Sequence, residues 1–298
     1  KAETRWACSD FSYFVFFCAL NHRKESVRVM KLSKEVFKRR FSLVAVVAVI
    51  LLLVLVNLAA AAGPSRLDEI LERGVVKVGT TGDYKPFTYF NKETKEYEGI
   101  DIDMAKSLAK TLGVKMEFVP TTWKNIVTDL VEDKYDVAVG GISKKLDRQM
   151  KVFFTIPYME TGKAPITRKE NVNKFQTLEQ IDQEGVVVIV NPGGTNEQFA
   201  RENLKKAKIL VYDDNVTIFD QIVAGKADLM ITDAVETLVQ ERIHPELAAV
   251  NPDKPFTFTE FGYMLPRGDI IFKEWVDLWL HTALKTGQFK EIFDSHIR

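Results

Sequence analysis

Cysteine is almost missing from this chain. The sequence of 298 residues contains 2 cysteines, Cys8 and Cys18, and both lie near its start. The rest of the chain therefore has no disulfide framework, no Cys-x-x-Cys motif and no cysteine nucleophile. The histidines, His22, His244, His281 and His296, are scattered without the spacing of metal ligands. We expect neither a metal site nor a cofactor.

An excess of charge of one sign is missing too. The sequence has 41 basic and 41 acidic side chains, so its formal net charge is +0, and nothing in this balance points to a nucleic-acid partner. Hydrophobic residues make up 46% and charged residues 28%, which is typical of a globular chain rather than a disordered one. The length predicts one large domain or two ordinary ones, and a homo-oligomer is compatible with it.

A long apolar run occurs only near the start of the chain. Met30 is followed by several lysines and arginines, then by an apolar run at 41–56 and an alanine-rich stretch at 59–63. This order is typical of a secretory signal peptide, so residues 30–62 are predicted to direct export to the periplasm or the medium. The run is long, so an uncleaved membrane anchor is the alternative, and only this segment would meet a membrane. Residues 1–29 fit no targeting pattern, and we interpret them as non-native upstream sequence.

Strands and helices are predicted to alternate after residue 64, in two successive series. The first series begins with a strand at 75–79 and the second with a strand at 185–190, with extended crossings at 152–158 and 256–265. Such alternation predicts α/β units on parallel sheets. We expect two lobes with a ligand cleft between them, one made of residues 65–161 plus 259–298 and the other of residues 162–258. Polar groups follow several of these strands, where ligands bind in open α/β sheets.

One strand end is unusual. Residues 188–190 form an apolar strand, and residues 191–197 read Asn-Pro-Gly-Gly-Thr-Asn-Glu before a helix. Glycines at the start of a helix leave backbone N–H groups free at the positive end of the helix dipole, which favours an anion. Glu197 is an acid at this place, with two interpretations. It is either a first-turn glutamate that complements the dipole, or a carboxylic acid held against an anionic substrate, with its pKa raised by burial and like charge.

The sequence also resembles a known superfamily. Segments typical of the two-lobed periplasmic solute-binding proteins for amino acids occur at residues 76–79, 83–87, 99–103, 136–138 and 143–148. A more specific resemblance, to the secreted cyclohexadienyl dehydratases, rests on residues 80–87, 175–182, 191–201, 214–219, 225–230 and 244–247. It implies a periplasmic-binding-protein fold and the conversion of prephenate to phenylpyruvate, or of arogenate to phenylalanine. It also implies Glu197 as the general acid and Arg148 as the clamp for the substrate carboxylate.

The sequence also predicts further substrate contacts, and several of these residues have a second, purely structural interpretation. Ser143 and Thr195 would help to bind the substrate, and Asn196 would orient Glu197 or the leaving hydroxyl. Lys163 is a second cation for the substrate or a solvated surface lysine, and Asp233 binds an ammonium group or caps a helix. The remaining predicted wall residues, each with core packing or a turn as the alternative, are Asp83, Tyr84 and Trp123.

Two functions from different classes are therefore expected. The first is a dehydratase that needs only to position a small anionic substrate and protonate a poor leaving group, without metal or cofactor. The alternative is a non-catalytic receptor that delivers an amino acid to an ABC transporter.

Overall fold

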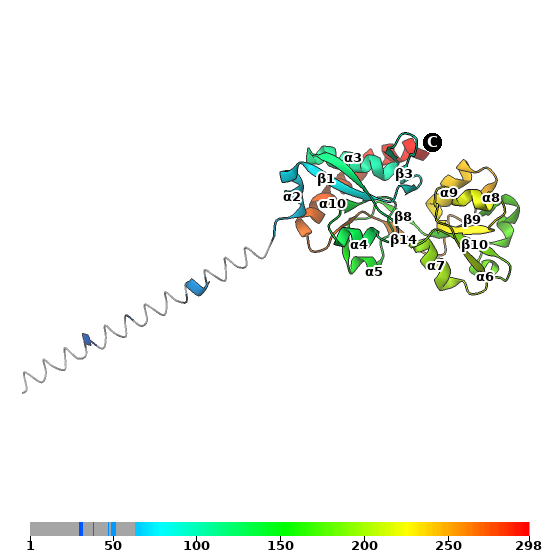
Figure 1. Ribbon diagram of the computed structural model, residues 1–298, viewed down its shortest axis with the longest axis horizontal. Coiled ribbons are helices and arrows are strands. Elements are labelled where there is room, and N and C mark those ends of the chain that lie inside the picture. The colour runs from blue at the N-terminus through cyan, green and yellow to red at the C-terminus, as the bar shows by residue number, and fades with distance from the viewer. Residues whose placement is uncertain (1–29, 32–37, 39–46, 48, 52–62, 298) are drawn as a thin grey trace, which may run out of the picture. The chain divides into compact units, whose positions relative to one another are not determined.

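The computed structural model describes residues 30–31, 38, 47, 49–51 and 63–297 (Figure 1). Residues Pro64–Arg298 form one compact unit. The predictions for residues 1–29 and 30–62 fall almost entirely outside the described residues and stay predictions. Within the described part of the chain, no helix has the length and apolar character that crossing a bilayer requires.

The first lobe is built on a five-stranded sheet with the order β5-β1-β6-β15-β7. Its parallel strands are β1 (Val75–Thr80), β5 (Lys115–Pro120) and β6 (Val137–Ala138), and the antiparallel β15 (Met264–Pro266) lies between β6 and β7 (Val152–Phe154). Since β15 comes from the end of the chain, the C-terminal segment completes the first lobe. The lobe also contains α2 (Arg66–Arg73), α3 (Ile100–Leu112), α4 (Ile126–Val131), α5 (Leu146–Gln149), α10 (Ile270–Lys285), α11 (Gln288–Ile297) and a small sheet of β2 (Asp83–Tyr84), β3 (Thr88–Phe90) and β4 (Tyr97–Glu98).

The second lobe repeats this plan with the strand order β11-β10-β12-β9-β13. The parallel strands are β10 (Val187–Val190), β11 (Lys208–Val211) and β12 (Leu229–Asp233), while β9 (Lys163–Arg168) runs antiparallel to β12 and to β13 (Leu247–Ala249). The helices are η1 (Lys169–Lys174, a 3-10 helix), α6 (Leu178–Ile181), α7 (Thr195–Asn203), α8 (Ile218–Val223) and α9 (Ala234–Ile243).

The apolar run in β10 explains why helices cover both faces of the second sheet. Successive side chains of a strand point to opposite faces. Ile189 packs into a core with residues of α8, whereas Val188 and Val190 pack into a second core with Ile181 and Ala200 of α6 and α7. A strand that is apolar at every position is typical of a parallel sheet buried on both sides.

Two extended segments join the lobes. They are β8 (Met159–Thr161) and β14 (Thr259–Phe261), which pair as an antiparallel ribbon. The lobe limits expected from the sequence, 65–161 with 259–298 and 162–258, stay a prediction, and the strands that make up the two sheets support it.

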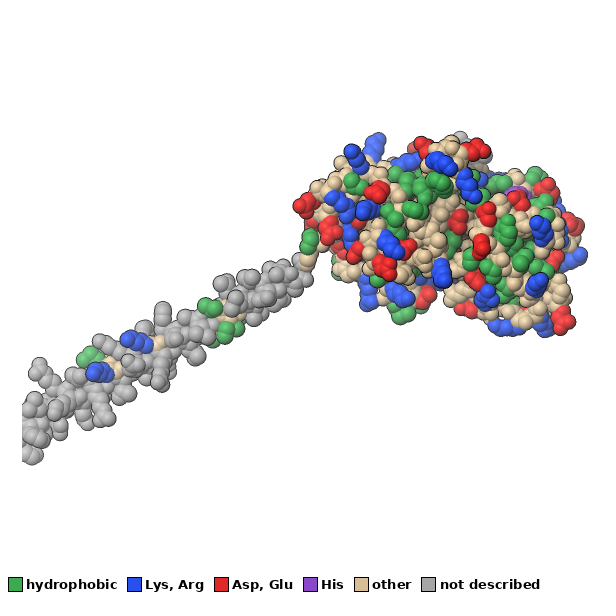
Figure 2. Space-filling model, viewed as in Figure 1, with side chains coloured by type: hydrophobic (Ala, Val, Ile, Leu, Met, Phe, Trp, Pro, Cys, Tyr) green, Lys and Arg blue, Asp and Glu red, His purple; other side chains and the backbone are tan. Residues whose placement is uncertain are grey.

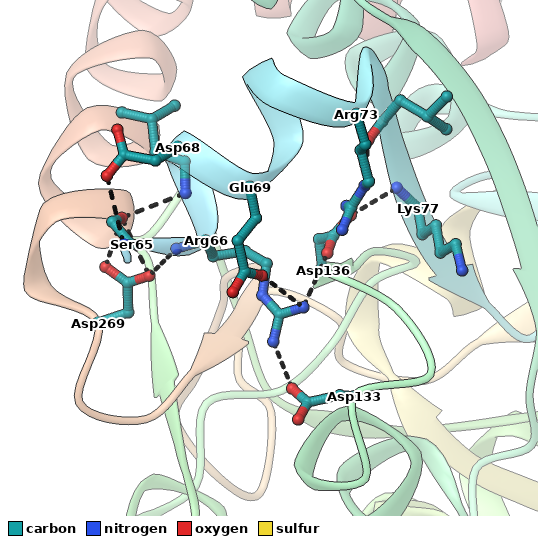
Figure 3. A network of polar contacts seen from close by, with 11 residues as sticks. Ser65, Arg66, Asp68, Glu69, Arg73, Lys77, Asp133, Asp136 and Asp269 are labelled. Atoms are coloured by element: carbon teal, nitrogen blue, oxygen red, sulfur yellow. Dashed lines mark hydrogen bonds and ion pairs between the residues drawn. The ribbon is translucent and has the colours of Figure 1, made fainter. Parts of the chain in front are cut away.

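The first helix of the compact unit is fixed by its ends (Figure 3). Ser65 caps α2 in a capping box, and Gly74 ends the helix in the left-handed conformation. The Ser65 hydroxyl and the Arg66 N–H both donate to Asp269. Arg73 pairs with the buried Asp136, which also accepts the Lys77 N–H at 2.7 Å. Residues 65–77 are thereby attached to the remainder of the first lobe.

Helix α3 begins at Ile100 and α4 begins at Ile126. In α3 the Asp103 N–H donates to the Gly99 carbonyl, and the acidic residues of the first turn are Asp101 and Asp103. Acids at this end of a helix are stabilised by the dipole.

Candidate functional site: a polar cavity between the lobes

The side chains on the visible face of the molecule do not indicate where the site lies. Figure 2 shows acidic and basic side chains interspersed over the visible face of residues 64–297. The candidate site is instead a small internal cavity of about 20 Å³ that both lobes line. Its walls are formed by Tyr84, Trp123, Gly141, Ser143, Arg148, Asn191, Gly194, Thr195, Asn196, Asn215 and Asp233. A space of this size holds one water molecule.

Most of the residues predicted from the sequence meet at this cavity. The predicted residues in its walls are Tyr84, Trp123, Ser143, Arg148, Thr195, Asn196 and Asp233. Two more lie directly behind the walls. The Lys163 ammonium contacts Thr195 and Asp233, and the Asp83 carboxylate accepts a hydrogen bond from Trp123 Nε1 at 3.0 Å.

Lys163 and Asp233 form a buried ion pair. Lys163 Nζ lies 2.9 Å from Asp233 Oδ1, and each side chain is 5% exposed. The ammonium also donates to Thr195 Oγ1 at 3.0 Å and to Asn196 Oδ1. All three of its donors therefore have partners, as a buried ammonium requires. The interpretation of Lys163 as a solvated surface lysine is wrong.

Tyr84 connects the lobes at Asp233. The Tyr84 hydroxyl, from the first lobe, donates to Asp233 Oδ2 in the second lobe at 2.9 Å. Burial raises the pKa of Tyr84 well above its ordinary value, and the charge of Asp233 adds to this effect, so the phenol keeps its proton. Asp233 stands at the N-cap position of α9 but makes no capping hydrogen bond with its side chain, so its oxygens are directed to Lys163 and Tyr84 instead.

Arg148 is a cation without a carboxylate partner among residues 63–297. The guanidinium donates to the Ser143 carbonyl at 3.1 Å, and no acidic side chain in that part of the chain lies within ion-pair distance of it. Burial lowers the pKa of Arg148, against the opposing charges of Asp147 and Asp233. A planar donor pair on the wall of the cavity is suited to bidentate binding of a carboxylate.

Glu197, the predicted acid, lies in a groove of about 440 Å³ next to the cavity. The residues that line both spaces are Trp123, Arg148, Gly194 and Thr195. Oε2 accepts the Gly193 N–H at 2.7 Å, and Oε1 pairs with Arg201 at 2.7 Å. The Gly193 hydrogen bond and the Arg201 charge together hold the pKa of Glu197 below its ordinary value, although partial burial opposes them. The raised pKa was predicted for the complex with an anionic substrate, and it stays a prediction.

Glu236 is a buried acid close to the cavity that the sequence analysis did not single out. It is 1% exposed and lies in the first turn of α9, one turn after Asp233. Burial raises the pKa of Glu236 to about 8, and the nearby charge of Asp233 adds to the increase. Glu236 lines neither the cavity nor the groove. Its helical spacing from Asp233 follows from the sequence, whereas its burial does not.

Asn215 is a second residue that the sequence interpretation did not place in the site. Its side chain is buried, its Nδ2 donates to the Asp83 carbonyl of the other lobe at 3.0 Å, and its Oδ1 has no partner. Since a carbonyl can only accept, the orientation of this amide is fixed and its free oxygen is an acceptor. Asn215 lines the cavity, so a ligand donor would satisfy that oxygen.

The floor of the cavity in the first lobe is held by Asp101. Its carboxylate accepts the N–H groups of Gly140 and Gly141, at 3.0 and 2.7 Å, and the hydroxyls of Tyr158 and Tyr263, at 2.7 and 3.0 Å. Burial raises the pKa of Asp101 to about 6 despite these four donors. Gly141 lines the cavity, so this buried carboxylate determines the position of one of its walls.

The fold and the site together define the class of protein. Two α/β lobes that enclose a polar cavity with a free arginine and a buried aspartate are typical of solute-binding proteins and of enzymes built on the same fold. Residues 76–298 match the model of the bacterial extracellular solute-binding proteins, family 3, and the chain belongs to this family.

Three similar proteins are informative. The chain is 56% identical over 240 residues to the cyclohexadienyl dehydratase of Pseudomonas aeruginosa, covering 80% of this chain and 89% of that protein. A crystal structure of an ancestral cyclohexadienyl dehydratase is 54% identical, with a TM-score of 0.51, and covers 79% of this chain and 97% of the other. A crystal structure of an ancestral amino acid-binding protein, described as a precursor of cyclohexadienyl dehydratase, is 38% identical with a TM-score of 0.73, covering 78% and 100%.

Proposed function

We propose that this protein is a cyclohexadienyl dehydratase that converts prephenate to phenylpyruvate and arogenate to phenylalanine. The identity of 56% to a named enzyme across most of both chains supports this activity. The observation in the site that carries it is the arrangement of Arg148 and Glu197, which line one groove beside the cavity. A cation for a substrate carboxylate and an acid for the leaving hydroxyl therefore face the same space.

In the proposed mechanism the polar side chains of the cavity bind the substrate. Arg148 binds one carboxylate through its two parallel N–H donors. Lys163 keeps Thr195 and Asn196 in place in the opposite wall, through contacts of 3.0 Å and 2.5 Å. Asp233 would bind the ammonium group of arogenate, and the free Asn215 Oδ1 accepts from the substrate hydroxyl.

Glu197 then protonates the hydroxyl oxygen of the ring. Enclosure beside the substrate carboxylates removes solvent and adds like charge, and both effects raise the pKa of Glu197. The C–O bond breaks and water leaves, while the bond between the ring and its carboxylate breaks and carbon dioxide leaves. The two electrons of that carbon–carbon bond enter the ring and make it aromatic. Glu197 is left as a carboxylate and takes up a proton from solvent. General acid catalysis of this kind accelerates a reaction by roughly 10²–10⁴-fold.

Substrate entry requires this cavity to widen. A volume of about 20 Å³ does not accommodate a ring with two carboxylate groups. The lobes are joined across the cavity by the Tyr84–Asp233 and Asn215–Asp83 hydrogen bonds. We propose that these contacts break when the substrate enters. Widening would join the cavity to the groove that Glu197 lines, so that one substrate contacts Arg148 and Glu197 together.

A non-catalytic amino acid receptor is the second candidate. The higher TM-score of the ancestral amino acid-binding protein, 0.73 against 0.51, favours it. However, a TM-score over two lobes falls when the lobes are rotated relative to each other, whereas sequence identity does not depend on rotation. Identity favours the dehydratase, 54% against 38%. A receptor also has no use for the acid Glu197 beside the anions of a substrate.

The test is to incubate the purified protein with prephenate and to follow phenylpyruvate by its absorbance in alkali. We expect turnover without added metal or cofactor, and arogenate is tested in parallel by the release of phenylalanine. The absence of turnover, together with tight binding of an amino acid in calorimetry, would favour the receptor.

We also propose export by residues 30–62 to the periplasm, in line with the extracellular character of the family. Sequencing the N-terminus of the protein from the periplasmic fraction tests this proposal. A mature N-terminus near residue 63 is expected for a cleaved signal peptide, and an intact N-terminus in the membrane fraction for an anchor.

A further inference from the structure

Trp123 is a wall of both spaces of the site. Its side chain lines the cavity of about 20 Å³ and the groove of about 440 Å³, which Arg148 and Glu197 also line. The rings of Trp123 and Tyr84 are perpendicular, with an interplanar angle of 89° and centroids 5.6 Å apart. A substrate that contacts Arg148 and Glu197 together lies against this indole, so the orientation of the indole limits where the substrate ring can lie.

The orientation of the indole is fixed by Asp83. Trp123 Nε1 donates to Asp83 Oδ1 at 3.0 Å. An indole N–H can only donate, so it needs an acceptor oxygen at this place. Burial raises the pKa of Asp83, whereas the hydrogen bonds from Thr81 and Trp123 oppose the increase because they stabilise the charged carboxylate.

The hydrogen bond between Asp83 and Trp123 lies within the first lobe. Asp83 belongs to β2, and Trp123 directly precedes the segment that begins α4. The two contacts that substrate entry would break, from Tyr84 to Asp233 and from Asn215 to the Asp83 carbonyl, join different lobes instead. The hydrogen bond to the indole is therefore kept when the lobes separate, and this wall is in place before the substrate arrives.

A loop of the second lobe packs on the same side chain. A Cβ placed on Gly194 would lie 3.7 Å from Trp123 Cβ and 3.8 Å from its Cγ, which is ordinary van der Waals contact. A Cβ placed on Gly193 would lie 2.8 Å from Lys124 Cβ, which is too close to fit. The Gly193 N–H in turn donates to Glu197 at 2.7 Å. Trp123 and Lys124 are thus the surface on which the loop that leads to Glu197 lies.

We propose that Asp83 is a positioning residue for the dehydration, which holds the Trp123 indole in place as the surface that receives the substrate ring and the loop of Glu197. This inference rests on the proposed function. Asp83 lines neither the cavity nor the groove, so it acts through Trp123. Any side chain that places an acceptor oxygen at the position of Oδ1 should therefore preserve the effect.

The test compares two substitutions of Asp83. Asp83→Asn keeps an acceptor oxygen for the indole and removes the charge, whereas Asp83→Leu removes the acceptor at similar volume. Asp277→Leu is the matched control, because Asp277 lies in α10 of the first lobe, accepts the Ile156 N–H at 2.8 Å and lines neither the cavity nor the groove. Thermal unfolding verifies that each variant is folded, and Asp83→Ala replaces the leucine variant if that one does not fold.

The indole is observed directly by NMR in protein labelled with ¹⁵N-tryptophan. The Nε1–H resonance of Trp123 is assigned by its loss in Trp123→Phe, and the resonances of Trp275 and Trp279 are internal references. In Asp83→Leu we expect the Trp123 resonance to move and its proton to exchange faster with solvent, while both references stay in place. In Asp83→Asn the Trp123 resonance should stay close to that of the wild type.

Kinetics with prephenate measure the consequence for the reaction. In Asp83→Leu we expect kcat/KM to fall about 10- to 100-fold, the range for one hydrogen bond to a charged group, mainly through KM because the wall is in place before binding. Asp83→Asn should recover most of this loss. In a Trp123→Phe background, Asp83→Leu should add little further loss, because the residue through which Asp83 acts has already lost its donor.

Each outcome decides for or against the proposal. It is supported if Asp83→Asn recovers the rate and the resonance, and if Asp277→Leu changes neither. It is overturned if Asp83→Leu leaves the Trp123 resonance in place, if Asp83→Asn loses as much rate as Asp83→Leu, or if Asp83→Leu costs as much in the Trp123→Phe background as alone. If the wild-type protein does not convert prephenate, the proposed function fails and this role of Asp83 is overturned with it. An active wild type whose Trp123 resonance does not respond to Asp83→Leu overturns the positioning role alone.

Discussion

The hydroxyl of Tyr84 donates to Asp233 Oδ2 at 2.9 Å, between residues 149 positions apart in the sequence. This contact closes the cavity between the lobes. The other carboxylate oxygen of Asp233, Oδ1, accepts a hydrogen bond from the Lys163 ammonium. Since Tyr84 keeps its phenolic proton and Asp233 only accepts, the hydrogen bond has a single direction. The proposed substrate entry would break this hydrogen bond and the one that Asn215 Nδ2 donates to the Asp83 carbonyl.

Removing this contact should loosen the closed form. In Tyr84→Phe we expect the lobes to separate more often, because a net stabilisation of about 0.5–1.5 kcal/mol, or more for a charged partner, is lost. Small-angle X-ray scattering of the ligand-free protein measures this as a larger radius of gyration. Tyr135→Phe is a control, since that hydroxyl bonds to the Ile126 carbonyl within one lobe. Equal radii for all three proteins would contradict the prediction.

The assignment of the acid gives a direct comparison of two glutamates. Glu197→Gln should lose roughly 10²–10⁴-fold in kcat, the range of general acid catalysis, and should still bind the substrate. Glu236→Gln should retain most of the rate, because Glu236 lines neither the cavity nor the groove. Steady-state kinetics with prephenate measures both. The opposite ranking of the two variants would assign the proton transfer to Glu236.

The same acid predicts the basic limb of the pH profile. A general acid must be protonated, so kcat should fall as the pH rises through the pKa of Glu197 in the substrate complex. A kcat that stays constant over the whole basic range would rule Glu197 out as the proton donor. Buffers of constant ionic strength are needed, because Arg148 and the substrate carboxylates interact through charge.

Glu236 should also make stability depend on pH. In the unfolded chain this group ionises near its ordinary pKa of 4.5, whereas the folded protein holds the proton up to about 8. Between these values folding takes up a proton, so stability falls as pH rises, by at most about 1.4 kcal/mol per pH unit. Glu236→Gln removes this loss and should exceed the wild type in stability by more at pH 8 than at pH 5. Urea unfolding at the two pH values measures the difference, and a constant difference would contradict the raised pKa.

Arg148 should act mainly on substrate binding. In Arg148→Lys the bidentate donor pair becomes a point charge, and we expect KM for prephenate to rise about 10- to 100-fold, in line with the loss of hydrogen bonds to a charged group. Arg201→Lys is the matched control, because Arg201 lies in the outer groove and pairs with Glu197. An unchanged KM in Arg148→Lys would show that another group holds the carboxylate.

Asp101 should be needed for stability and for the shape of the cavity. Asp101→Asn places an amide NH₂ opposite some of the four donors from Gly140, Gly141, Tyr158 and Tyr263. Each buried donor left without a partner costs about 1–3 kcal/mol. For a chain of this size each kcal/mol lowers Tm by roughly 2–4 °C, so the total loss should be clear in calorimetry. Asp103→Asn, at a partly exposed ion pair with His296, is the control and should change Tm much less.

Local sequence determined the elements and most of the site. Strands β1 and β10 begin the two series at Val75 and Val187, close to the starts predicted at residues 75 and 185. The two series of strands and helices gave the two-lobed fold. Because ligand groups in α/β folds gather at strand ends, the pattern also brought Tyr84, Arg148, Thr195 and Asp233 to one cavity. These features depend on short-range periodicity and chain direction, which the sequence contains.

The role of each glutamate was decided by tertiary structure. Glu197 and Glu236 both occupy the first turn of a helix after a strand end, and local sequence does not distinguish them. Packing leaves Glu197 partly exposed beside Arg201 and the Gly193 N–H, which stabilise its charge. Packing also encloses Glu236 behind Asp233 and Thr232, where loss of solvation favours the proton. A pKa depends on burial and on neighbours from distant segments, so only the folded chain gives the two carboxyl groups different pKa values.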